Sequence, residues 1–306
     1  MAQISDNLPE DLPEAVGKLT VSESDARAVS LTVLEAQYEL LRKWGTPFVD
    51  HSDFDTLRMK VVKYPDGGFL QFFEPWPLQR LLSLPIDFSD QDVAEDVERA
   101  YGRINYCSYM RGLATCSFYP RLTSIHECFI SEVQRWQRRG PDGQTHRLPF
   151  LTRWKFFEWY TPKIDTDMIF HVEWACSGGW AFSGSKKYPH FKAAMYTAVR
   201  LDPEDQLLRS ELLIILGIMI ERLRNESLKD HAIIPVMLFS FLGPRCGRVL
   251  TAYFDGQHLV VQRLPLLNFP GSPNSDAMFE FVRFQAAGIT PGLDTTRFPK
   301  PTGVVF

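Results

Sequence analysis

Apolar residues recur at helical spacing in several parts of the chain. From about residue 24 they lie three or four positions apart until Gly45 and Pro47, which predicts a helix that ends there. Residues 89–106 show a similar pattern, with Ser89 as the expected N-cap. Residues 124–139 predict another helix, because Ser124 precedes a glutamate by the three residues of a capping box.

Two further segments predict helices nearer the C-terminus. Residues 204–225 are apolar on nearly all sides, so we expect this helix to be buried. It should begin after Asp202-Pro203-Glu204, which offers a cap and an N1 proline. Residues 275–287 are expected to form a final helix.

Strand patterns occupy most of the remaining chain. Residues 57–64 and 69–76 flank the turn Pro65-Asp66-Gly67-Gly68 and predict a hairpin. Residues 148–176 alternate and are rich in aromatic residues, which predicts strands, followed by a glycine/serine loop around Trp180. Three more strands are expected at 232–243, 248–254 and 258–267, with Asp255-Gly256 as the hairpin turn between the last two.

This order contains no regular βαβ alternation and no internal repeat. It favours an α+β fold in which a mostly antiparallel sheet packs around a buried central helix at about 204–225. No linker is evident between 23 and 306, so we expect one domain there, preceded by a flexible acidic arm at residues 1–22.

Composition narrows the class of protein. The chain has 306 residues, of which 45% are hydrophobic, 23% charged and 13% aromatic, and this excludes a largely disordered or fibrous chain. Residues 1–30 hold six acidic and two basic residues, which accounts for the whole net charge of −4 and leaves a neutral body. A neutral body is not the basic footprint of a general nucleic-acid binder, although it allows a local basic patch.

Cysteine usage and the N-terminal segment predict a compartment. The 5 cysteines show no CxxC spacing, which is typical of reduced thiols and not of disulfides or zinc ligands. We see no signal peptide and no apolar run long enough to span a bilayer. The expectation is a cytoplasmic protein that works without a membrane, a metal or another cofactor.

No standard catalytic signature is present, so candidate residues come from local chemistry. His171 and Glu173 lie two residues apart, on one face of a predicted strand, where they can form an acid/base pair or be satisfied by structural neighbours. Cys176, which stands next to Ser177, suggests a nucleophile, but the sequence places no base beside it.

One carboxylate stands in an apolar helix. Glu211 must be paired, protonated or functional there, because an unpaired buried charge is costly. Residues 243–248 read GPRCGR, and the two arginines can bind a phosphate or cap a turn. Arg248 can alternatively pair with a carboxylate such as Glu211, so both a functional and a structural role stay open for these residues.

Residues 135–155 form the most basic stretch, and tryptophans are interleaved with its cations. Arginine beside tryptophan suits single-stranded RNA or a tRNA end, although a solvated surface gives the same pattern. The candidate tRNA contacts are Arg135, Arg138, Arg139, Arg153, Lys155, Lys186 and Lys187. Trp174 and Trp180, next to small residues, can shape an apolar pocket or pack in a sheet.

The segments LLRSELLIIL (207–216) and IPVMLFSFLGPRCGRVLTAYFDGQHLVVQRLPLL (234–267) resemble a large group of fungal proteins. Some members of that group are similar to arginine-containing cyclodipeptide synthases. The resemblance implies an enzyme that takes aminoacyl groups from tRNA and joins arginine to a second amino acid as a diketopiperazine. Its partners would be arginyl-tRNA and a second aminoacyl-tRNA, and the activated ester needs neither ATP nor metal.

Residues can be matched to this chemistry by type. A guanidinium calls for carboxylates, for which Glu211, Glu173, Glu158 and Asp255 are candidates. Proton transfer from the attacking amine suits His171, Glu173 or Glu211. The substrate pocket would draw on Trp174, Trp180 and Arg248. A serine, cysteine or tyrosine can carry a transient acyl group.

A different class of protein is the alternative. A helix with Glu211 followed by strands with Asp255 between them faintly resembles a PD-(D/E)xK nuclease core. The closing strand carries Gln262 and Arg263 where an acid and a lysine one apart would stand, so a two-carboxylate Mg²⁺ site is not expected. This alternative is a degenerate nuclease-like fold that acts as a nucleic-acid-binding or interaction module.

Overall fold

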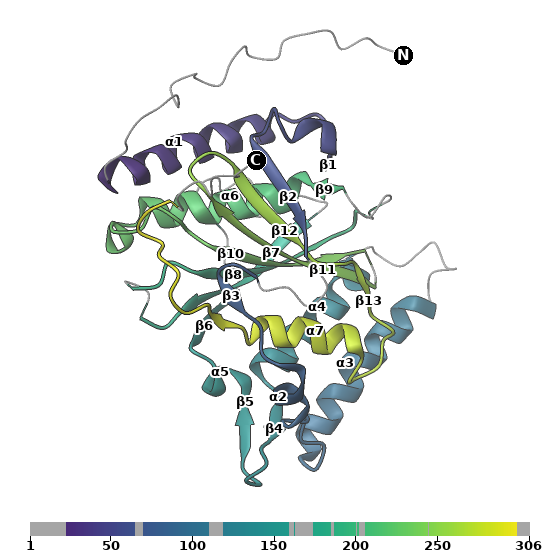
Figure 1. The fold of residues 1–306 in the computed structure, drawn as a ribbon. Coiled ribbons are helices and arrows are strands. Elements are labelled where there is room, and N and C mark those ends of the chain that lie inside the picture. The colour runs from purple at the N-terminus through teal and green to yellow at the C-terminus, as the bar shows by residue number, and fades with distance from the viewer. Residues whose placement is uncertain are drawn as a thin grey trace, which may run out of the picture.

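A large mixed sheet organises the protein (Figure 1). The computed structural model describes residues 23–64, 70–109, 119–158, 162, 174–184, 187–199, 201, 206–243 and 245–298. The sheet has 8 strands. Seven lie in the order β2 (Met59–Lys63), β12 (Leu259–Arg263), β11 (Cys246–Phe254), β10 (Val236–Leu242), β8 (Phe191–Thr197), β7 (Trp174–Phe182) and β6 (Trp154–Glu158), and β13 (Leu267–Asn268) pairs with β11.

Strand directions in the sheet are mixed. β10 is parallel to β8 and β2 is parallel to β12, whereas the other neighbouring strands run antiparallel. The two strands of each parallel pair are joined by a long connection. The connection from β8 to β10 contains α6, and the connection from β2 to β12 contains most of the chain. The fold is therefore a mixed α/β arrangement.

Two helices cover one face of the sheet, α1 (Glu23–Arg42) and α6 (Arg209–Arg224) (Figure 1). Leu34 and Leu41 of α1 pack in one cluster with α6 residues such as Ile215 and with sheet residues such as Leu238 and Leu250. Because α1 lies on one side of α6 and the sheet on the other, α6 can be apolar nearly all round. The helix is buried in a layer against the sheet, and the sheet does not wrap around it.

The opposite face is covered by α4 (Tyr119–Gln134) and α7 (Asp276–Gln285), and α3 (Gln91–Tyr109) packs against α4. The short helices α2 (Leu78–Leu82) and α5 (Leu148–Leu151) lie on the same side of the sheet. Phe129 of α4 and Phe281 of α7 pack with their ring centroids 5.9 Å apart. Both rings also contact Phe239 and Phe241 of β10. This aromatic layer fixes α4 against the centre of the sheet.

A buried lysine joins α7 to the sheet. The ammonium of Lys192, on β8, donates to the carbonyl oxygens of Phe284, Gln285 and Ala287 at 3.1, 2.6 and 3.0 Å. Burial lowers the pKa of this amine, whereas the carbonyl oxygens at the C-terminal end of the helix favour its charged form.

Several predicted elements agree with the structure. The helix from about residue 24, the strands β10, β11 and β12, the Asp255-Gly256 turn and the final helix are confirmed. The predicted helix at 204–225 is present as α6, which starts at Arg209 after the short strand β9 (Leu207–Leu208), paired with β1 (Phe48–Val49). Its expected cap at 202–204 lies outside the described residues.

Other element predictions were wrong. Residues 57–64 and 69–76 do not pair with each other, because β2 joins β12 and β3 (Phe73–Glu74) joins β14 (Gly288–Ile289). The helix expected to reach residue 139 ends at Gln134, and β4 (Gln137–Arg139) then forms a hairpin with β5 (Thr145–Arg147). The loop expected around Trp180 is the buried strand β7.

The proposed acidic arm at 1–22 lies outside the described residues. In the part of the chain that the structure describes, no helix combines the length and apolarity needed to cross a membrane.

Candidate functional site: a polar cleft between two helices and the sheet

A cleft of about 430 Å³ opens where α3 and α4 cross the end of the sheet that carries β6, β7 and β8. Its polar lining comes from five elements. The lining includes Asp96, Arg99 and Arg103 of α3, His126, Glu127 and Ser131 of α4, Arg135 just after it, Phe156 and Glu158 of β6, Ser177 of β7 and Tyr196 of β8.

Ser177 occupies a β-bulge at the base of this cleft. Cys176 pairs with Met195 and Gly178 pairs with Ala194, so Ser177 is the extra residue between two adjacent partners on β8. A bulge re-aims the side chain of the inserted residue, and bulges are common beside active sites. Here the Ser177 Oγ lies 2.5 Å from Nε2 of His126 and 3.2 Å from the carbonyl oxygen of Ala194.

His126 is held in place by its helix and by two rings. α4 packs against β8 and β10, and the imidazole centroid lies 5.4 Å from that of Tyr196 and 5.5 Å from that of Phe241. Burial lowers the pKa of His126 to about 3, so the ring is neutral at physiological pH. The Ser177 hydroxyl has one proton, which it can donate either to the Ala194 carbonyl oxygen or, in the tautomer of His126 with a proton on Nδ1, to Nε2.

The next residue, Gly178, leaves room for one wall of the cleft. A Cβ atom on it would lie 2.7 Å from Cε2 of Phe156 and 3.8 Å from Cδ1 of Ile130. Any larger residue would push this ring away. The run Ser177-Gly178-Gly179 is thus part of a strand in which small residues allow a bulge and an aromatic wall to lie side by side.

Charged residues of both signs surround the opening. Arg99 pairs with Asp96 at 3.6 Å, and Arg103 pairs with Glu127 at 3.5 Å. Glu158 and Arg135 are exposed, and neither has an ion-pair partner within the described residues. The rim therefore offers carboxylates to a cationic group and guanidinium groups to an anionic one.

Glu211 and Arg248 are found together, away from this cleft. Nε of Arg248 donates to Oε1 of Glu211 at 2.9 Å, and the Arg248 Nη2 donates to Oε2. The carboxylate also accepts from the backbone N–H of Leu208 at 2.9 Å, and Arg248 Nη1 donates to the carbonyl oxygen of Gln206 at 2.8 Å. Both side chains are at most 1% exposed.

The sequence allowed Arg248 either to bind a phosphate or to pair with Glu211, and the structure has the pair. Neither residue lines this cleft or the cavity bordered by Arg153 and Lys187. Glu211 neutralises Arg248 and caps the first turn of α6, so it has no open space in which to contact a substrate. In the structure Glu211 and Arg248 share a role in stabilising the core, and the expected roles of Glu211 in catalysis and of Arg248 in substrate binding stay predictions without support from this geometry.

Three other substrate-binding candidates also have local structural roles. The Asp255 carboxylate accepts from the backbone N–H groups of Gln257 and His258 and so closes the turn between β11 and β12. Trp180 is fully buried among Phe129, Phe156 and Phe239. Trp174 packs in the core on the α1/α6 side of the sheet. The proposed aromatic pocket is thus core packing, and of this set Glu158 alone lies in the cleft.

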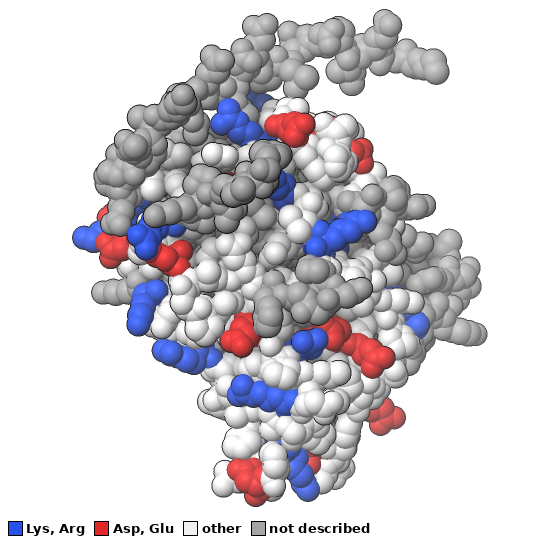
Figure 2. All heavy atoms as spheres, viewed as in Figure 1, with Lys and Arg blue, Asp and Glu red and all other residues white. Residues whose placement is uncertain are grey.

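The basic stretch at 135–155 does not form one surface. Arg138 is buried, donates to Glu132 at 2.5 Å and to the Leu84 carbonyl oxygen at 2.8 Å, and so cannot contact tRNA. Trp136 is buried too and donates to Asp96 at 2.8 Å. On the face seen in Figure 2, basic and acidic side chains alternate and do not form a patch of one sign.

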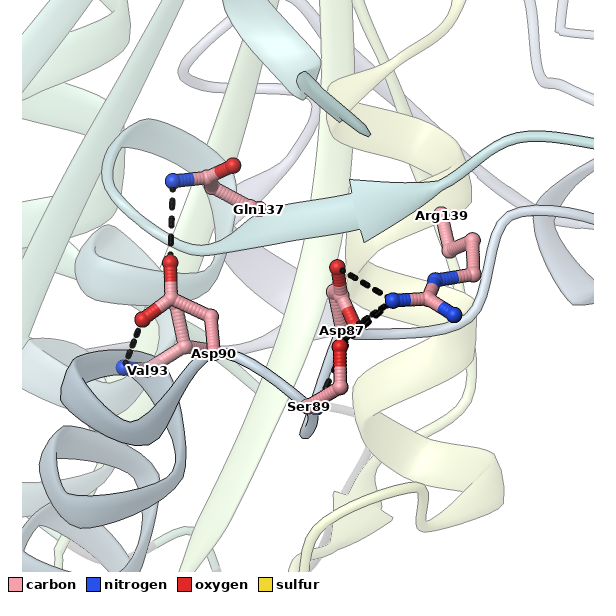
Figure 3. Close-up of polar contacts among 6 residues, drawn as sticks. All are labelled: Asp87, Ser89, Asp90, Val93, Gln137 and Arg139. Carbon is pink, nitrogen blue, oxygen red and sulfur yellow. Dashed lines mark hydrogen bonds and ion pairs between the residues drawn. The ribbon is translucent and has the colours of Figure 1, made fainter. Parts of the chain in front are cut away.

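Arg139 belongs to a polar network at the start of α3 (Figure 3). Its guanidinium pairs with Asp87 at 3.0 Å and also donates to Ser89 Oγ at 2.5 Å. Asp90, and not Ser89 as expected, caps α3 by accepting from the Val93 backbone N–H at 3.3 Å. This network attaches β4 to α3, so half-exposed Arg139 has a structural role as well.

The remaining predicted tRNA contacts are dispersed. Arg135 lies at the cleft, Lys155 is exposed on β6 near the ring of Phe157, and Arg153 and Lys187 border a second cavity. His171, Glu173 and Lys186 lie outside the described residues. Within the described residues, no group of three or more histidine, cysteine, aspartate or glutamate side chains is arranged to hold a metal ion.

Comparisons with family models, with curated proteins and with solved structures find no match for this chain. Any function must therefore be argued from the site. The Ser177–His126 pair was missed because its members lie 51 residues apart in the sequence. The sequence feature that could have indicated the bulge was the serine–glycine run inside an otherwise aromatic and β-branched region, because glycine within a strand often marks a bulge.

Proposed function

We propose that the cleft around Ser177 is an acyl-transfer site, and that the chain is a transferase acting on aminoacyl esters of tRNA. The product would be a diketopiperazine that joins arginine to a second amino acid. The observation that carries the proposal is the Ser177 hydroxyl on a β-bulge, 2.5 Å from a neutral imidazole nitrogen and facing a polar cleft. A hydroxyl beside an acceptor nitrogen is the arrangement that nucleophilic catalysis requires.

In the first step Ser177 Oγ attacks the carbonyl carbon of the aminoacyl ester. Its proton passes to Nε2 of His126 as the new C–O bond forms. The bond from the carbonyl carbon to the ribose oxygen then breaks, and the ribose oxygen takes the proton from His126. The result is an aminoacyl ester on Ser177 and a free tRNA hydroxyl, with no other reactant consumed.

The second step uses the α-amine of another aminoacyl-tRNA. The amine attacks the acyl-enzyme ester, His126 transfers the amine's proton to the departing Ser177 Oγ, and a dipeptidyl-tRNA remains. Its free α-amine then attacks the carbonyl carbon of its own ester, the bond to the ribose oxygen breaks, and that oxygen takes the amine's proton, which closes the six-membered ring and releases tRNA. Each step exchanges an ester for an amide or an equivalent ester, so neither ATP nor a redox partner is needed.

The charged rim suits such a substrate. Glu158, which has no ion-pair partner within the described residues, can bind a guanidinium through two oxygens. Arg135 lies at the same opening and can bind a phosphate of the tRNA acceptor end. A cytoplasmic location, where charged tRNA is found, belongs to the same proposal.

The direct test incubates the purified chain with arginyl-tRNA and a second aminoacyl-tRNA and measures cyclic dipeptides by mass spectrometry. We expect product from the wild-type protein and none from Ser177→Ala. Ser240→Ala is the matched control, because Ser240 is a buried serine of the same sheet that does not line the cleft. Full activity of Ser177→Ala would refute the proposed nucleophile, and absence of product from every tested pair would refute the proposed reaction.

The nuclease-like alternative has no comparable support. It assigned a functional carboxylate to Asp255, and that carboxylate closes a turn and lies 3.7 Å from Lys60. Its other acid, Glu211, is paired in the core.

A further inference from the structure

A second cavity, of about 860 Å³, lies at the other end of the β6–β7 pair. Arg153 precedes β6, and the Ser183 backbone N–H donates to the Arg153 carbonyl oxygen at 2.6 Å where β7 has ended. The opposite wall is the segment 289–296, which begins at the last residue of β14. Ser177 lies five residues before Phe182 on β7, so this cavity is separate from the acyl-transfer cleft.

The inner surface of this cavity carries an unsatisfied histidine. His190 is 2% exposed, and neither of its ring nitrogens makes a hydrogen bond of ordinary geometry within the described residues, although the backbone of Phe72 interacts with the imidazole. The Phe73 ring packs edge-on against the imidazole with centroids 5.5 Å apart, so the ring is fixed in place. A buried polar group without a partner is costly, and such a group lining a cavity is typical of a site that a ligand completes.

His231 is next to it and is already engaged. Its Nδ1 lies 2.7 Å from Oγ1 of Thr295, which fixes the segment 289–296 at the cavity wall. The Thr295 carbonyl oxygen also accepts from the backbone N–H groups of Ala232 and Ile233 at 2.9 and 3.0 Å. The wall is therefore held by three hydrogen bonds, and the cavity is preformed.

Two cations stand at the opening, each above an aromatic ring. The guanidinium carbon of Arg153 lies 5.1 Å from the centroid of Phe182, and Nζ of Lys187 lies 5.5 Å from that of Tyr188. The Phe182 and Tyr188 rings contact each other edge to face, with centroids 5.2 Å apart. This places two positive groups on one rigid aromatic platform.

Acidic groups at the opening do not cancel both cations. The Asp294 carboxylate accepts from the backbone N–H and hydroxyl of Thr296 and pairs with Arg297 at 2.8 Å. Asp230 interacts with the guanidinium of Arg27, on the α1 side. Arg153 and Lys187 therefore remain available to an anion.

We propose that this cavity binds a phosphorylated organic molecule of nucleotide size, with its phosphate at Arg153 and Lys187 and a polar group of its body at His190. A guanidinium and an ammonium that line one cavity are typical of phosphate recognition. The volume far exceeds that of phosphate alone, and aromatic and apolar residues such as Tyr188, Pro291 and Leu293 line the rest. Neutral His190, whose pKa burial lowers to about 3, suits a hydrogen bond with an uncharged group of the ligand.

The experiment is isothermal titration of the full chain with AMP, and with inorganic phosphate and adenosine as separate arms. We expect AMP to bind and each half to bind at least tenfold more weakly. The surface variant Arg153→Ala/Lys187→Ala should weaken AMP binding about 100-fold, because two charge-assisted contacts are lost. The matched control, Lys43→Ala/Lys63→Ala, removes two exposed cations elsewhere and should bind AMP as the wild type does.

His190→Phe tests the inner end of the site, with circular dichroism as the check on folding. It should weaken AMP binding about tenfold and leave phosphate binding unchanged. Lack of AMP binding at millimolar concentration, or unchanged AMP binding by Arg153→Ala/Lys187→Ala, would overturn the proposal. Because the Ser177→Ala variant should bind AMP normally, failure here and failure of the acyl-transfer proposal are distinguishable.

Discussion

Removing the negative charge of Glu211 is expected to destabilise the protein strongly. In Glu211→Gln the Arg248 guanidinium stays fully buried but loses the carboxylate that accepts from its Nε and Nη2. Breaking one side of a buried ion pair costs about 3–5 kcal/mol, because the remaining charge is left uncompensated. The amide also accepts more weakly from the Leu208 N–H, which loosens the first turn of α6.

The double variant Glu211→Leu/Arg248→Met separates the cost of an uncompensated buried charge from the cost of altered packing. Replacing both partners of a buried pair by apolar residues of similar volume is often neutral or stabilising. We therefore expect the double variant to be more stable than Glu211→Gln by about 2 kcal/mol or more. An additive result, in which the double variant is less stable than either single variant, would contradict the assignment of the pair.

Urea denaturation followed by circular dichroism measures the free energy of unfolding of each variant. The same samples should be assayed for cyclic dipeptide, with activity expressed per folded molecule. We expect the loss of activity in Glu211→Gln to follow the loss of folded protein. Wild-type stability together with abolished turnover would refute the structural role and return Glu211 to the list of catalytic candidates.

Three further predictions concern buried polar groups and packing. Burial lowers the pKa values of His126 and His190 to about 3, so the native state binds fewer protons than the unfolded state between pH 6.5 and pH 3. The free energy of unfolding should therefore fall as the pH drops, by about 2 kcal/mol per histidine between pH 7.5 and pH 5, as measured by urea titration. Gly178→Ala places a Cβ 2.7 Å from a phenylalanine ring of β6 and should cost about 1–3 kcal/mol, whereas Gly45→Ala, with open space around it, should change the melting temperature little. Lys192→Met removes the donor to the Gln285 carbonyl oxygen, whereas the Phe284 and Ala287 oxygens still accept from the Ala287 N–H and the Trp154 indole; this should cost about 1–3 kcal/mol and speed hydrogen exchange at the end of α7.

Local patterns predicted the elements whose signals lie within a few residues of one another. The Asp255-Gly256 signal predicted the pairing of β11 with β12, because a short connection, here residues 255–258, brings its own flanking strands together. α6 was evident because its apolar run is longer than a strand. By contrast, β2 pairs with β12, about 200 residues away, and periodicity identifies a strand without naming its partner.

The candidate site depended on information that the sequence does not carry locally. An unpaired charge in the core is costly, which is why the Glu211–Arg248 pair could be anticipated as an alternative. The Ser177–His126 contact depends on the bulge in β7, and shifting that strand by one residue would turn the hydroxyl toward the opposite face. Register at this level is set by the assembled sheet and by α4 packed against it.

The measurement that tests the central claim most directly is the identification of an acyl-enzyme. The wild-type chain is mixed with arginyl-tRNA carrying isotope-labelled arginine, quenched in acid and digested for peptide mass spectrometry. The account predicts a labelled arginyl ester on Ser177, its absence from Ser177→Ala, and its discharge into dipeptide when a second aminoacyl-tRNA is added. Label on another residue, or cyclic dipeptide made by Ser177→Ala, would contradict it.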